Sequence, residues 1–410
     1  MKETLKDIAD ICTTELRRIW NDKGVTLIFL IATLLYPLIF GAVYKNEMVR
    51  NVPIAVVDES QGYYGKRFIH KIDATPEINI SYKCNSMEEA KQLMKARKIN
   101  GILLIPRDYE RMIAGKETAR ICLFCDMSSF LYYRSVLTGA SGVLVDEMQE
   151  IQLERYALAG ITGESADELV QALPYEDVKL YSPGGGFKSF LVPALLVLVI
   201  HQTLFLGISI LFGTSREEKR TRLDASAHLR DKWSGKVVIG RATALLLIYI
   251  PLVAIDLVLV PIIFGLPHIG RLGDLCLFIL PFLLATIFFC MTVCSFVRER
   301  DSGIVTCIFF SVPLLFMSGA VWPPCGMPSF WKYFSYIFPS THGIQGFIRI
   351  NTMGATLPQV KFEYLMLWLQ VLVYFITSCV CVKRDSTIKQ KELRYYGNES
   401  YSKEASATEN

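Results

Sequence analysis

Few residue patterns in this chain of 410 amino acids are suited to catalysing a reaction. The glycine-rich run 184–189 contains a Lys-Ser pair, but its frame differs from the GxxxxGK[ST] loop that cradles nucleotide phosphates. No HExxH or GxSxG motif is present, and the eleven cysteines show no zinc-ligand spacing. Cys122 and Cys125 fall in a predicted strand, where positions three apart face opposite sides, so we expect no redox pair, although a structural disulfide involving Cys84 is an alternative. The sequence therefore predicts no enzyme, no metal site and no cofactor bound by this chain.

Three polar side chains interrupt long apolar runs and are candidates for a function inside a membrane. His201 and Gln202 lie in one run, and Asp256 lies in the middle of the next. An acidic side chain within hydrocarbon is costly, so Asp256 is predicted to face the interior of a helix bundle or an aqueous path. A purely structural role is the alternative, in which Asp256 pairs with Arg241, His201 or Gln202. Arg241 is also close enough to the end of its run to extend into the interface.

The elements that must position these side chains are apolar runs long enough to cross a membrane. The chain is 52% hydrophobic with a mean hydropathy of +0.34, which is too apolar for an ordinary soluble protein. Each run has roughly the 20 residues that cross about 30 Å of hydrocarbon as a helix. We therefore expect an α-helical polytopic membrane protein with six transmembrane helices. They are predicted at 24–44, 187–212, 237–264, 272–297, 303–321 and 362–382.

Residues 45–183 are predicted instead to form an α/β domain inserted after the first span, because short β-rich runs alternate with helical stretches. Strands are expected at 52–58, 78–82, 101–105 and 119–126, and helices at 65–72, 86–97 and 106–114. Ser86, with Glu89 three residues later, has the pattern of a helix cap. A long helical region from Ser129 to about Leu173, with a break at 160–163, could then return the chain to the membrane as a stalk.

The first 23 residues are amphipathic, with apolar residues at three- and four-residue intervals and basic flanks. This pattern is typical of a helix that lies in the membrane interface, and a plain cytosolic helix is the alternative.

The segments on the N-terminal side of the six spans carry twenty Lys and Arg residues, and the two short links on the other side carry four. The positive-inside rule therefore predicts a multi-pass protein of the inner (plasma) membrane with cytoplasmic N- and C-termini, a cytoplasmic tail at 383–410 and an extracytoplasmic 45–183 domain.

Two connections are longer than a helix reversal requires. Residues 213–236 form a highly charged internal segment, which is either a solvated loop made basic for topology or a docking element for a cytoplasmic partner. Residues 322–350 contain aromatic and apolar stretches too short to span and bounded by prolines, which predicts a re-entrant or interfacial outer segment. An ordinary outer loop packed on the bundle is the alternative. The candidate gate residues in this segment are Trp322, Pro323, Met327, Pro328, Pro339 and Arg349.

Several separately placed motifs resemble the permease subunit of type 2 ABC exporters, the six-span group with a large external domain after the first span. VPIAVVDESQG at 52–62, INGILLIPRDYERMIAG at 99–115 and the strand at 119–128 resemble segments of the family's external domain. The most specific match is MSGAVWPPCGMPSFWKYFSYIFPSTHGIQGFIR at 317–349, which resembles the family signature after the fifth span. The resemblance covers nearly the whole chain.

This resemblance implies an exporter that moves a hydrophobic or amphipathic substrate outward, driven by a separate cytoplasmic ABC ATPase that binds the ATP. It also implies a second permease subunit, identical or different, an adaptor protein on the outer side and contact with membrane lipid, but no nucleic acid. Movements of the ATPase would enter through the N-terminal helix and the loop at 213–236. The residues at the matching coupling positions are Arg216, Glu217, Glu218, Lys219, Arg220, Gly235 and Lys236. The loop departs from the family pattern at 221–227, which indicates a partner specialised to this chain.

A non-transporting receptor or interaction protein, whose external α/β domain binds a ligand, is the alternative from another functional class. A membrane-embedded enzyme fits less well, because no acid/base or metal set converges in the sequence. A neighbouring gene for a P-loop ATPase would favour transport over the receptor.

Overall fold

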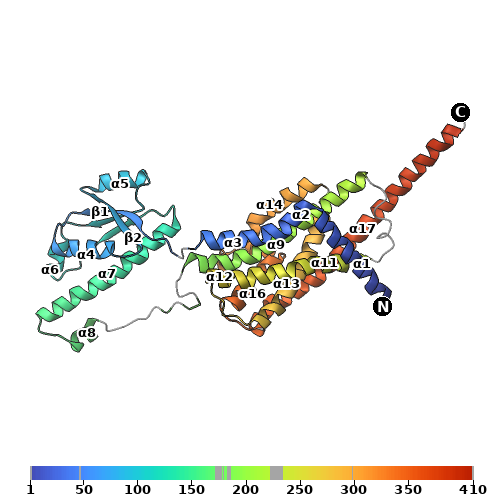
Figure 1. The fold of residues 1–410 in the computed structure, drawn as a ribbon. Coiled ribbons are helices and arrows are strands. Elements are labelled where there is room, and N and C mark those ends of the chain that lie inside the picture. Colours follow the sequence, from blue (N-terminus) through green and yellow to red (C-terminus); the bar gives the residue numbers. More distant parts are fainter. Residues whose placement is uncertain are drawn as a thin grey trace. The chain divides into compact units, whose positions relative to one another are not determined.

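The structure, a computed structural model, describes residues 2–45, 48–170, 178, 180–181, 186–221, 234–297 and 299–408, with the backbone alone at 2, 218–221 and 385–408. The chain divides into two units, which are described separately (Figure 1). One unit comprises residues 1–45 and 187–410, and its described part is helical. The other comprises residues 46–186 and contains a small sheet.

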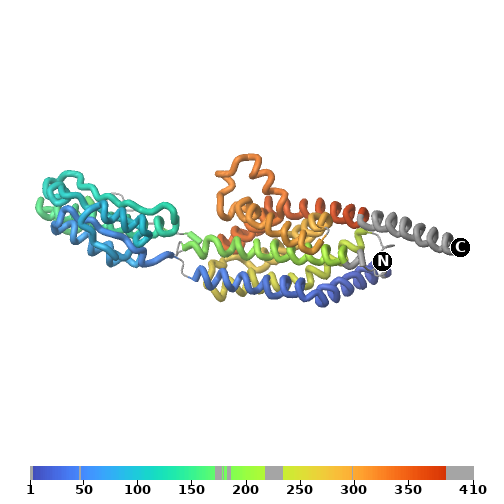
Figure 2. Tube along the Cα trace, turned by 90° about the horizontal axis from the view of Figure 1, so that it is seen from above, coloured from blue at the N-terminus to red at the C-terminus, as the bar shows by residue number. Residues whose placement is uncertain are grey.

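Among the described residues of the first unit, six helices are long and apolar enough to cross a membrane, as the sequence predicts. They lie alongside one another in both views of the chain (Figures 1 and 2). The candidate spans are Lys23–Val43, Phe187–Glu217, Ser234–Phe264, Leu272–Cys294, Arg300–Met317 and Leu357–Arg384. The prediction of a predominantly helical, six-span bundle is therefore confirmed.

Two helices extend beyond the ends predicted from hydropathy. Helix α9 (Phe187–Thr221) continues past the predicted end at 212, and α17 (Lys361–Thr408) continues through the predicted tail at 383–410. The prediction of a loop at 213–236 is therefore wrong for residues 213–221, which belong to α9, and for 234–236, which begin the helix Ser234–Ala254. Hydropathy marks where the apolar side chains stop, but Arg, Glu and Lys are themselves good helix formers, so the helix need not stop there. Residues 222–233 of the predicted loop lie outside the described residues.

The first span begins where an aspartate interrupts the N-terminal helix. Helix α1 (Lys2–Asn21) ends just before Asp22, whose side chain accepts hydrogen bonds from the backbone of Gly24 at 2.9 Å and of Val25 at 3.2 Å. Asp22 therefore caps the next helix and separates the amphipathic segment from the span. The span itself consists of α2 (Lys23–Thr26), the π-helix η1 (Leu27–Ala32) and α3 (Thr33–Val43).

The third span also contains a π-helical turn. It consists of α11 (Ser234–Ala254), the π-helix η2 (Ile255–Leu259) and α12 (Val260–Phe264), and ends at Gly265 in the left-handed conformation with a φ of 62°. Pro261 has no backbone N–H, which removes a helical hydrogen bond next to the π-helical turn. The fourth and fifth spans are the helices α13 (Leu272–Cys294) and α14 (Arg300–Met317).

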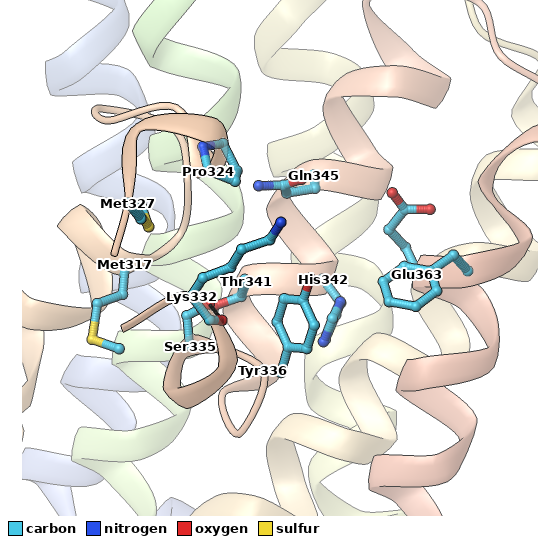
Figure 3. Close-up of a pocket in the computed structure, with 11 residues that line it drawn as sticks. Met317, Pro324, Met327, Lys332, Ser335, Tyr336, Thr341, His342, Gln345 and Glu363 are labelled. Atoms are coloured by element: carbon cyan, nitrogen blue, oxygen red, sulfur yellow. Dashed lines mark hydrogen bonds between the residues drawn. The ribbon is translucent and has the colours of Figure 1, made fainter. Parts of the chain in front are cut away.

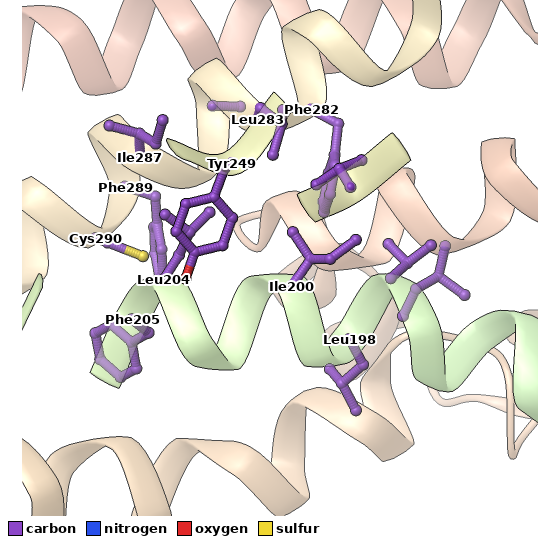
Figure 4. Packing of buried hydrophobic residues seen from close by; sticks show 14 of the residues in the cluster. Leu198, Ile200, Leu204, Phe205, Tyr249, Phe282, Leu283, Ile287, Phe289 and Cys290 are labelled. Carbon is purple, nitrogen blue, oxygen red and sulfur yellow. The ribbon is translucent and has the colours of Figure 1, made fainter. Parts of the chain in front are cut away.

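Helix α9 is the centre of the bundle. In its most apolar window 78% of the residues are buried, compared with 17% in the corresponding windows of α14 and α17. Figure 4 shows Ile200, Leu204 and Phe205 of α9 packed with Tyr249 of α11 and Phe289 of α13. Helices α14 and α17 leave many apolar side chains exposed, as expected for helices that face lipid rather than water.

The segment after the fifth span forms short helices rather than an extended loop. Its two α-helices are α15 (Ser329–Ser335) and α16 (Pro339–Asn351). The 3-10 turn η3 (Pro324–Gly326) precedes them and the 3-10 turn η4 (Leu357–Val360) follows them. Helix α16 packs on α13, where a Cβ on Gly343 or Gly346 would lie 2.4 Å or 2.1 Å from a phenylalanine ring. Small residues therefore let α16 enter the bundle. Its depth in a membrane stays a prediction.

The second unit contains a four-stranded sheet in the order β2-β1-β3-β4. Strand β1 is parallel to both β2 and β3, and β4 is antiparallel to β3. The strands are β1 (Val52–Asp58), β2 (Ile78–Cys84), β3 (Gly101–Ile105) and β4 (Cys122–Cys125). The helices are α4 (Tyr63–Asp73), α5 (Met87–Lys95), α6 (Tyr109–Ala114), α7 (Phe130–Leu158) and α8 (Glu164–Val170).

The two faces of this sheet are covered by different helices, because alternate residues of β1 point to opposite sides. Val56 packs in a cluster with residues of α4 and α7, whereas Ala55 and Val57 pack in another cluster with α5. Ser86 accepts a hydrogen bond from the backbone of Glu89 at 3.2 Å and caps α5, as its sequence pattern predicts. All eleven cysteines of the chain are unpaired, so no disulfide forms at Cys84, Cys122 or Cys125.

A buried glutamate joins α4 to α7 in this unit. Glu147 is 1% exposed and its carboxylate lies 2.7 Å from Arg67 and 2.8 Å from Lys71. Burial lowers the pKa of Lys71, but its hydrogen bonds to Glu147 and Glu150 outweigh burial, so the pKa is raised overall. The hydrogen bond from Lys71 likewise lowers the pKa of Glu150. The network therefore keeps both lysine and glutamate charged and ties the long helix to the sheet layer.

Glu147→Gln should destabilise the packing of α4 on α7 by about 3 kcal/mol, because it leaves two basic side chains without their buried partner. Hydrogen exchange of the full chain, read in residues 63–73 and 130–158, would show the loss of protection. Glu150→Gln is the matched control, because that side chain is 48% exposed and its loss should cost less than about 1 kcal/mol. Equal effects of the two substitutions would contradict a central role for Glu147.

Candidate functional site

The predicted coupling region is built around the packing of α1 on α11. Lys236, in the first turn of α11, donates a hydrogen bond to Asp7 of α1 at 3.0 Å. Gly240 lies one turn further along, where a Cβ would come within 2.7 Å of the Ile11 side chain. The amphipathic helix is therefore held against the third span by an ion pair and by close backbone approach, and its apolar face is buried on protein.

Glu15 extends this contact to the second span. It is 8% exposed and lies 3.8 Å from Arg18 and 3.7 Å from Arg241. Arg18 donates to the backbone carbonyl of Leu211 in α9 at 2.8 Å, and the Arg241 guanidinium lies over the Phe212 ring at 5.4 Å. Both arginines thus connect α1 to the end of α9. A displacement of α1 must move these side chains with it.

The end of α9 is in turn bound to the start of α14. Arg216 donates hydrogen bonds to the backbone carbonyls of Ser295 and Val297, which lie between α13 and α14. Glu217 accepts a hydrogen bond from the backbone N–H of Arg300 at 2.8 Å. The carboxylate there meets the first turn of a helix, where negative charge is favourable. We call the contacts among α1, the end of α9 and the starts of α11 and α14 the helix-end junction.

The remaining predicted coupling residues divide into two groups. Gly235 is buried at the start of α11, next to Lys236. The side chains of Glu218, Lys219 and Arg220 lie outside the described residues, although the α9 backbone runs through them. The structure therefore brings Arg216, Glu217, Gly235 and Lys236 into one junction, and their contact with an ATPase stays a prediction.

The polar side chains inside the bundle are separate from this junction. His201 is fully buried with neither ring nitrogen hydrogen-bonded within the described residues, and its ring lies 5.6 Å from that of Phe289. Gln202 contacts the thiol of Cys307 on α14 at 3.4 Å through its side-chain oxygen. Asp256 is fully buried in the π-helix η2. π-Helical turns inside α-helices occur frequently at functional sites.

The expected structural partners of Asp256 do not bind it. Among the described residues, neither carboxylate oxygen of Asp256 has a hydrogen-bond partner. Arg241 pairs with Glu15 instead, and the imidazole of His201 makes no hydrogen bond there. The alternative of a satisfied structural pair is therefore wrong for this conformation. A buried carboxyl group without a partner is costly, which favours a functional role for Asp256.

The segment after the fifth span borders a small cavity of about 40 Å³, between the end of α14, α15, α16 and the start of α17 (Figure 3). Lys332, His342, Gln345 and Glu363 line it together with Met327. Gln345 donates to the carbonyl of Ser318 at 3.2 Å, which ties α16 to the end of α14. The cavity has room for a water molecule but not for a drug-sized ligand. This cavity by itself is therefore not a substrate-binding site in the described conformation.

The predicted gate residues make different contacts in this segment. Pro323 and Pro328 precede η3 and α15, and Pro339 is the first residue of α16, where its missing N–H costs nothing. Arg349 donates to Glu363 of α17 at 2.8 Å and to the carbonyl of Gln359 at 2.7 Å. Trp322 is instead 56% exposed. A role of these residues in gating stays a prediction.

Sequence reasoning missed the cavity residues His342, Gln345 and Glu363. Glu363 carries a signal, because it is an acidic residue in the first turn of an apolar span. No local sequence pattern marks His342 or Gln345, because they meet Glu363 only when α16 packs against the bundle. Among the described residues, no cluster of three His, Cys, Asp or Glu side chains is placed to bind a metal ion.

Comparison with known proteins identifies the family. A sequence family described as "ABC-2 family transporter protein" matches residues 23–380, which include all six candidate spans except the end of the last. The chain belongs to this family.

Similarity to individual members is distant but extensive. The chain is 20% identical over 330 residues to YbhR of Escherichia coli (strain K12), described as a probable multidrug ABC transporter permease, and the match covers 80% of this chain and 85% of YbhR. YbhR of Escherichia coli O157:H7 matches with the same values. The resemblance to ABC-2 type permeases is thus confirmed, and this ABC-2 family member is a membrane protein. Family membership also implies an ATPase subunit as a partner.

Gly213→Ala tests the close approach of α9 and α14 in this ABC-2 family member. A Cβ at Gly213 would lie 2.6 Å from the backbone Cα of Arg300, so the helices must separate, and we expect a loss of about 2 kcal/mol in stability. Thermal unfolding of the purified protein in detergent measures this loss. Gly273→Ala is the control, since its Cβ would meet nothing within 4 Å and should be neutral or stabilising by about 0.5–1 kcal/mol. A neutral Gly213→Ala would show that the two helices are not in contact there.

Asp256→Leu should raise thermal stability, because it replaces an unpartnered buried carboxyl group with an apolar side chain of similar size. We expect a gain of about 1–3 kcal/mol, the usual penalty of an unsatisfied buried polar group. Asp301→Leu, at an exposed position in the first turn of α14, is the control and should change stability by less than about 1 kcal/mol. Destabilisation by Asp256→Leu would instead mean that the carboxylate has a stabilising partner in the membrane.

Proposed function

We propose that this chain is the permease subunit of an ABC exporter that moves a hydrophobic or amphipathic substrate outward across the inner membrane, driven by a separate cytoplasmic ATPase. The observation that carries the proposal is the helix-end junction. In this junction Lys236 and Glu15 join α1 to α11. Arg18 joins α1 to the central helix α9, and Arg216 and Glu217 join the end of α9 to the start of α14. A force applied to α1 or to this segment would reach the first, second, third and fifth spans together.

In this proposal Arg216 and Glu217 transmit the movement, because their side chains are bound to the adjacent helix ends. Contact with the ATPase falls to the exposed surface of α1 and to the segment from Glu218 to 233. ATP would be bound by the partner, which supplies the energy for alternating access. Helix α9 would carry the movement inward, since it contacts α13, α14 and α16.

The bundle also suggests the nature of the substrate. Its interior is apolar around a few polar side chains, of which His201 and Asp256 have no partner among the described residues. Such a lining suits a molecule with a large apolar surface and few polar groups. The multidrug description of YbhR supports this class. In the proposed cycle the small cavity beneath α15 and α16 is part of a closed outer gate that opens for release.

The distribution of Lys and Arg supports cytoplasmic N- and C-termini, which would place the 46–186 unit on the outer side. There it would shield the exit or dock an adaptor protein. A second permease subunit would complete the path, as in other transporters built from paired membrane subunits. Family membership favours this reading over the receptor alternative.

Affinity capture of the detergent-solubilised protein from its native host, followed by mass spectrometry, tests the coupling. We expect a P-loop ATPase to be recovered with the unmodified chain. Replacing residues 222–233 with a Gly/Ser segment of equal length should abolish its recovery, because the proposed contact lies there. The matched control replaces residues 398–409, a segment of equal length on the same predicted side, and should retain the ATPase.

Two results would refute the proposal. One is the absence of any ATPase under conditions in which a known ABC exporter keeps its own. The other is equal recovery of the ATPase with both replaced chains, which would remove the coupling role of 222–233.

A further inference from the structure

A second cavity lies beside the helix-end junction and is not explained by export or by coupling. It has a volume of about 620 Å³ and is formed by the last turns of α1, the start of the first span, the end of α9 and the start of α14. Its lining includes four basic side chains and one acidic side chain. They are Arg17, Arg18, Lys23, Arg300 and Asp22. The cavity is therefore strongly electropositive.

The basic side chains of this cavity are only partly neutralised by the described protein around them, since Arg18 lies 3.8 Å from Glu15 of α1. Asp22 lies 3.6 Å from Arg300, but it also accepts the two backbone hydrogen bonds that cap the first span. Within the described part of the chain, the side chains of Arg17 and Lys23 form no hydrogen bond or ion pair. Thr214 lines the same cavity, and its buried hydroxyl has no hydrogen-bond partner among the residues that the structure describes. Two cations and a hydroxyl donor are thus available to an anion.

The cavity lies where three spans begin or end. Lys23 is the first residue of the first span, Arg300 is the first residue of the fifth, and Thr214 is in the last turn of the second. These positions mark the boundary between hydrocarbon and water, which is the depth of lipid phosphate groups. Trp20, at the end of α1, is 58% exposed, as is common for tryptophan at this depth.

An exposed apolar stripe leads away from the cavity along the first span. Leu27, Ile31, Leu35 and Ile39 follow Lys23 at four-residue intervals and are 41–56% exposed. The π-helix at Leu27–Ala32 has more than four residues per turn, which helps to keep these positions on one face. The acyl chain of a lipid could lie along this stripe while the lipid headgroup occupied the cavity. A free phosphate ion would make no use of the stripe.

We infer that this cavity binds the phosphate headgroup of an anionic lipid, with Arg17 and Lys23 as ligands of the phosphate and the stripe from Leu27 to Ile39 as the acyl-chain contact. Basic pockets between transmembrane helices bind anionic headgroups in this way. Because α1 forms one wall of the cavity, a bound lipid would also hold α1 against α9. The inference concerns a regulatory lipid site and does not depend on the proposed ATPase contact.

The test uses the full-length protein purified in detergent and titrated with phosphatidylglycerol, with thermal unfolding as the readout. Phosphatidylcholine, which is zwitterionic, and inorganic phosphate are titrated in parallel. We expect phosphatidylglycerol to raise Tm and the other two to have little effect. Arg17→Gln combined with Lys23→Gln should weaken binding and so raise the half-saturating phosphatidylglycerol concentration by about tenfold or more. Each basic residue near an anionic surface contributes about 1 kcal/mol to binding.

Lys6→Gln combined with Lys361→Gln is the matched control. Both lysines are exposed and lie outside the cavity, and the two substitutions remove the same total charge as the first pair. An equal weakening in both double variants, or in neither, would refute the site. Stabilisation by inorganic phosphate that is lost in the Arg17→Gln/Lys23→Gln variant would assign the cavity to a free anion rather than to a lipid. If the Arg17→Gln/Lys23→Gln variant lost the ATPase in affinity capture but kept its response to phosphatidylglycerol, the cavity would be assigned to ATPase binding and the inference would be refuted. None of these results tests export itself.

Discussion

The close packing of α9 is the interaction on which the rest of the bundle depends. Within a bilayer there is little hydrophobic driving force between helices, so their association relies on tight van der Waals contact and on hydrogen bonds. Gly207 and Gly213 of α9 and Gly303 of α14 allow that contact, because a Cβ at any of them would come within 2.8 Å of a neighbouring atom. Ser209 adds a hydrogen bond to Cys294 of α13 at 2.9 Å. If α9 moves, the surrounding helices must therefore move with it or lose these contacts.

Apart from Asp256, the ionic contacts described in this packed region lie at its ends, and their arrangement there is asymmetric. At one end, Glu15 of α1 lies between Arg18 and Arg241, and Lys236 holds Asp7. At the other, Arg349 binds Glu363 beside a nearly closed cavity. The first end contains an amphipathic helix that a cytoplasmic partner could move, whereas the second is built from short helices with proline starts. This difference suits a protein driven from one side and opened on the other.

The bundle interior keeps polar groups that packing alone would not select. Asp256 lies in a π-helical turn without a partner, and His201 is buried against aromatic rings. The buried carboxylate of Glu147, by contrast, lies within ion-pair distance of both Arg67 and Lys71. In the proposed export function, these interior groups would gain partners in another conformation or from a substrate. Their cost is tolerated because the rest of α9 and α11 is well packed.

The sequence alone determined the number of spans, the strands Val52–Asp58 and Gly101–Ile105 and the family, since each depends on local hydropathy, on alternation or on a contiguous motif. It also marked Asp256, Arg216 and Arg349 as candidates. It did not reveal where α9 ends, because its charged turn is as helical as its apolar one. Nor could it pair Arg241 with Glu15 rather than with Asp256, or place His342 and Glu363 around one cavity. Those choices join residues that are distant in the chain, so they depend on how the helices pack, and only the tertiary structure decided them.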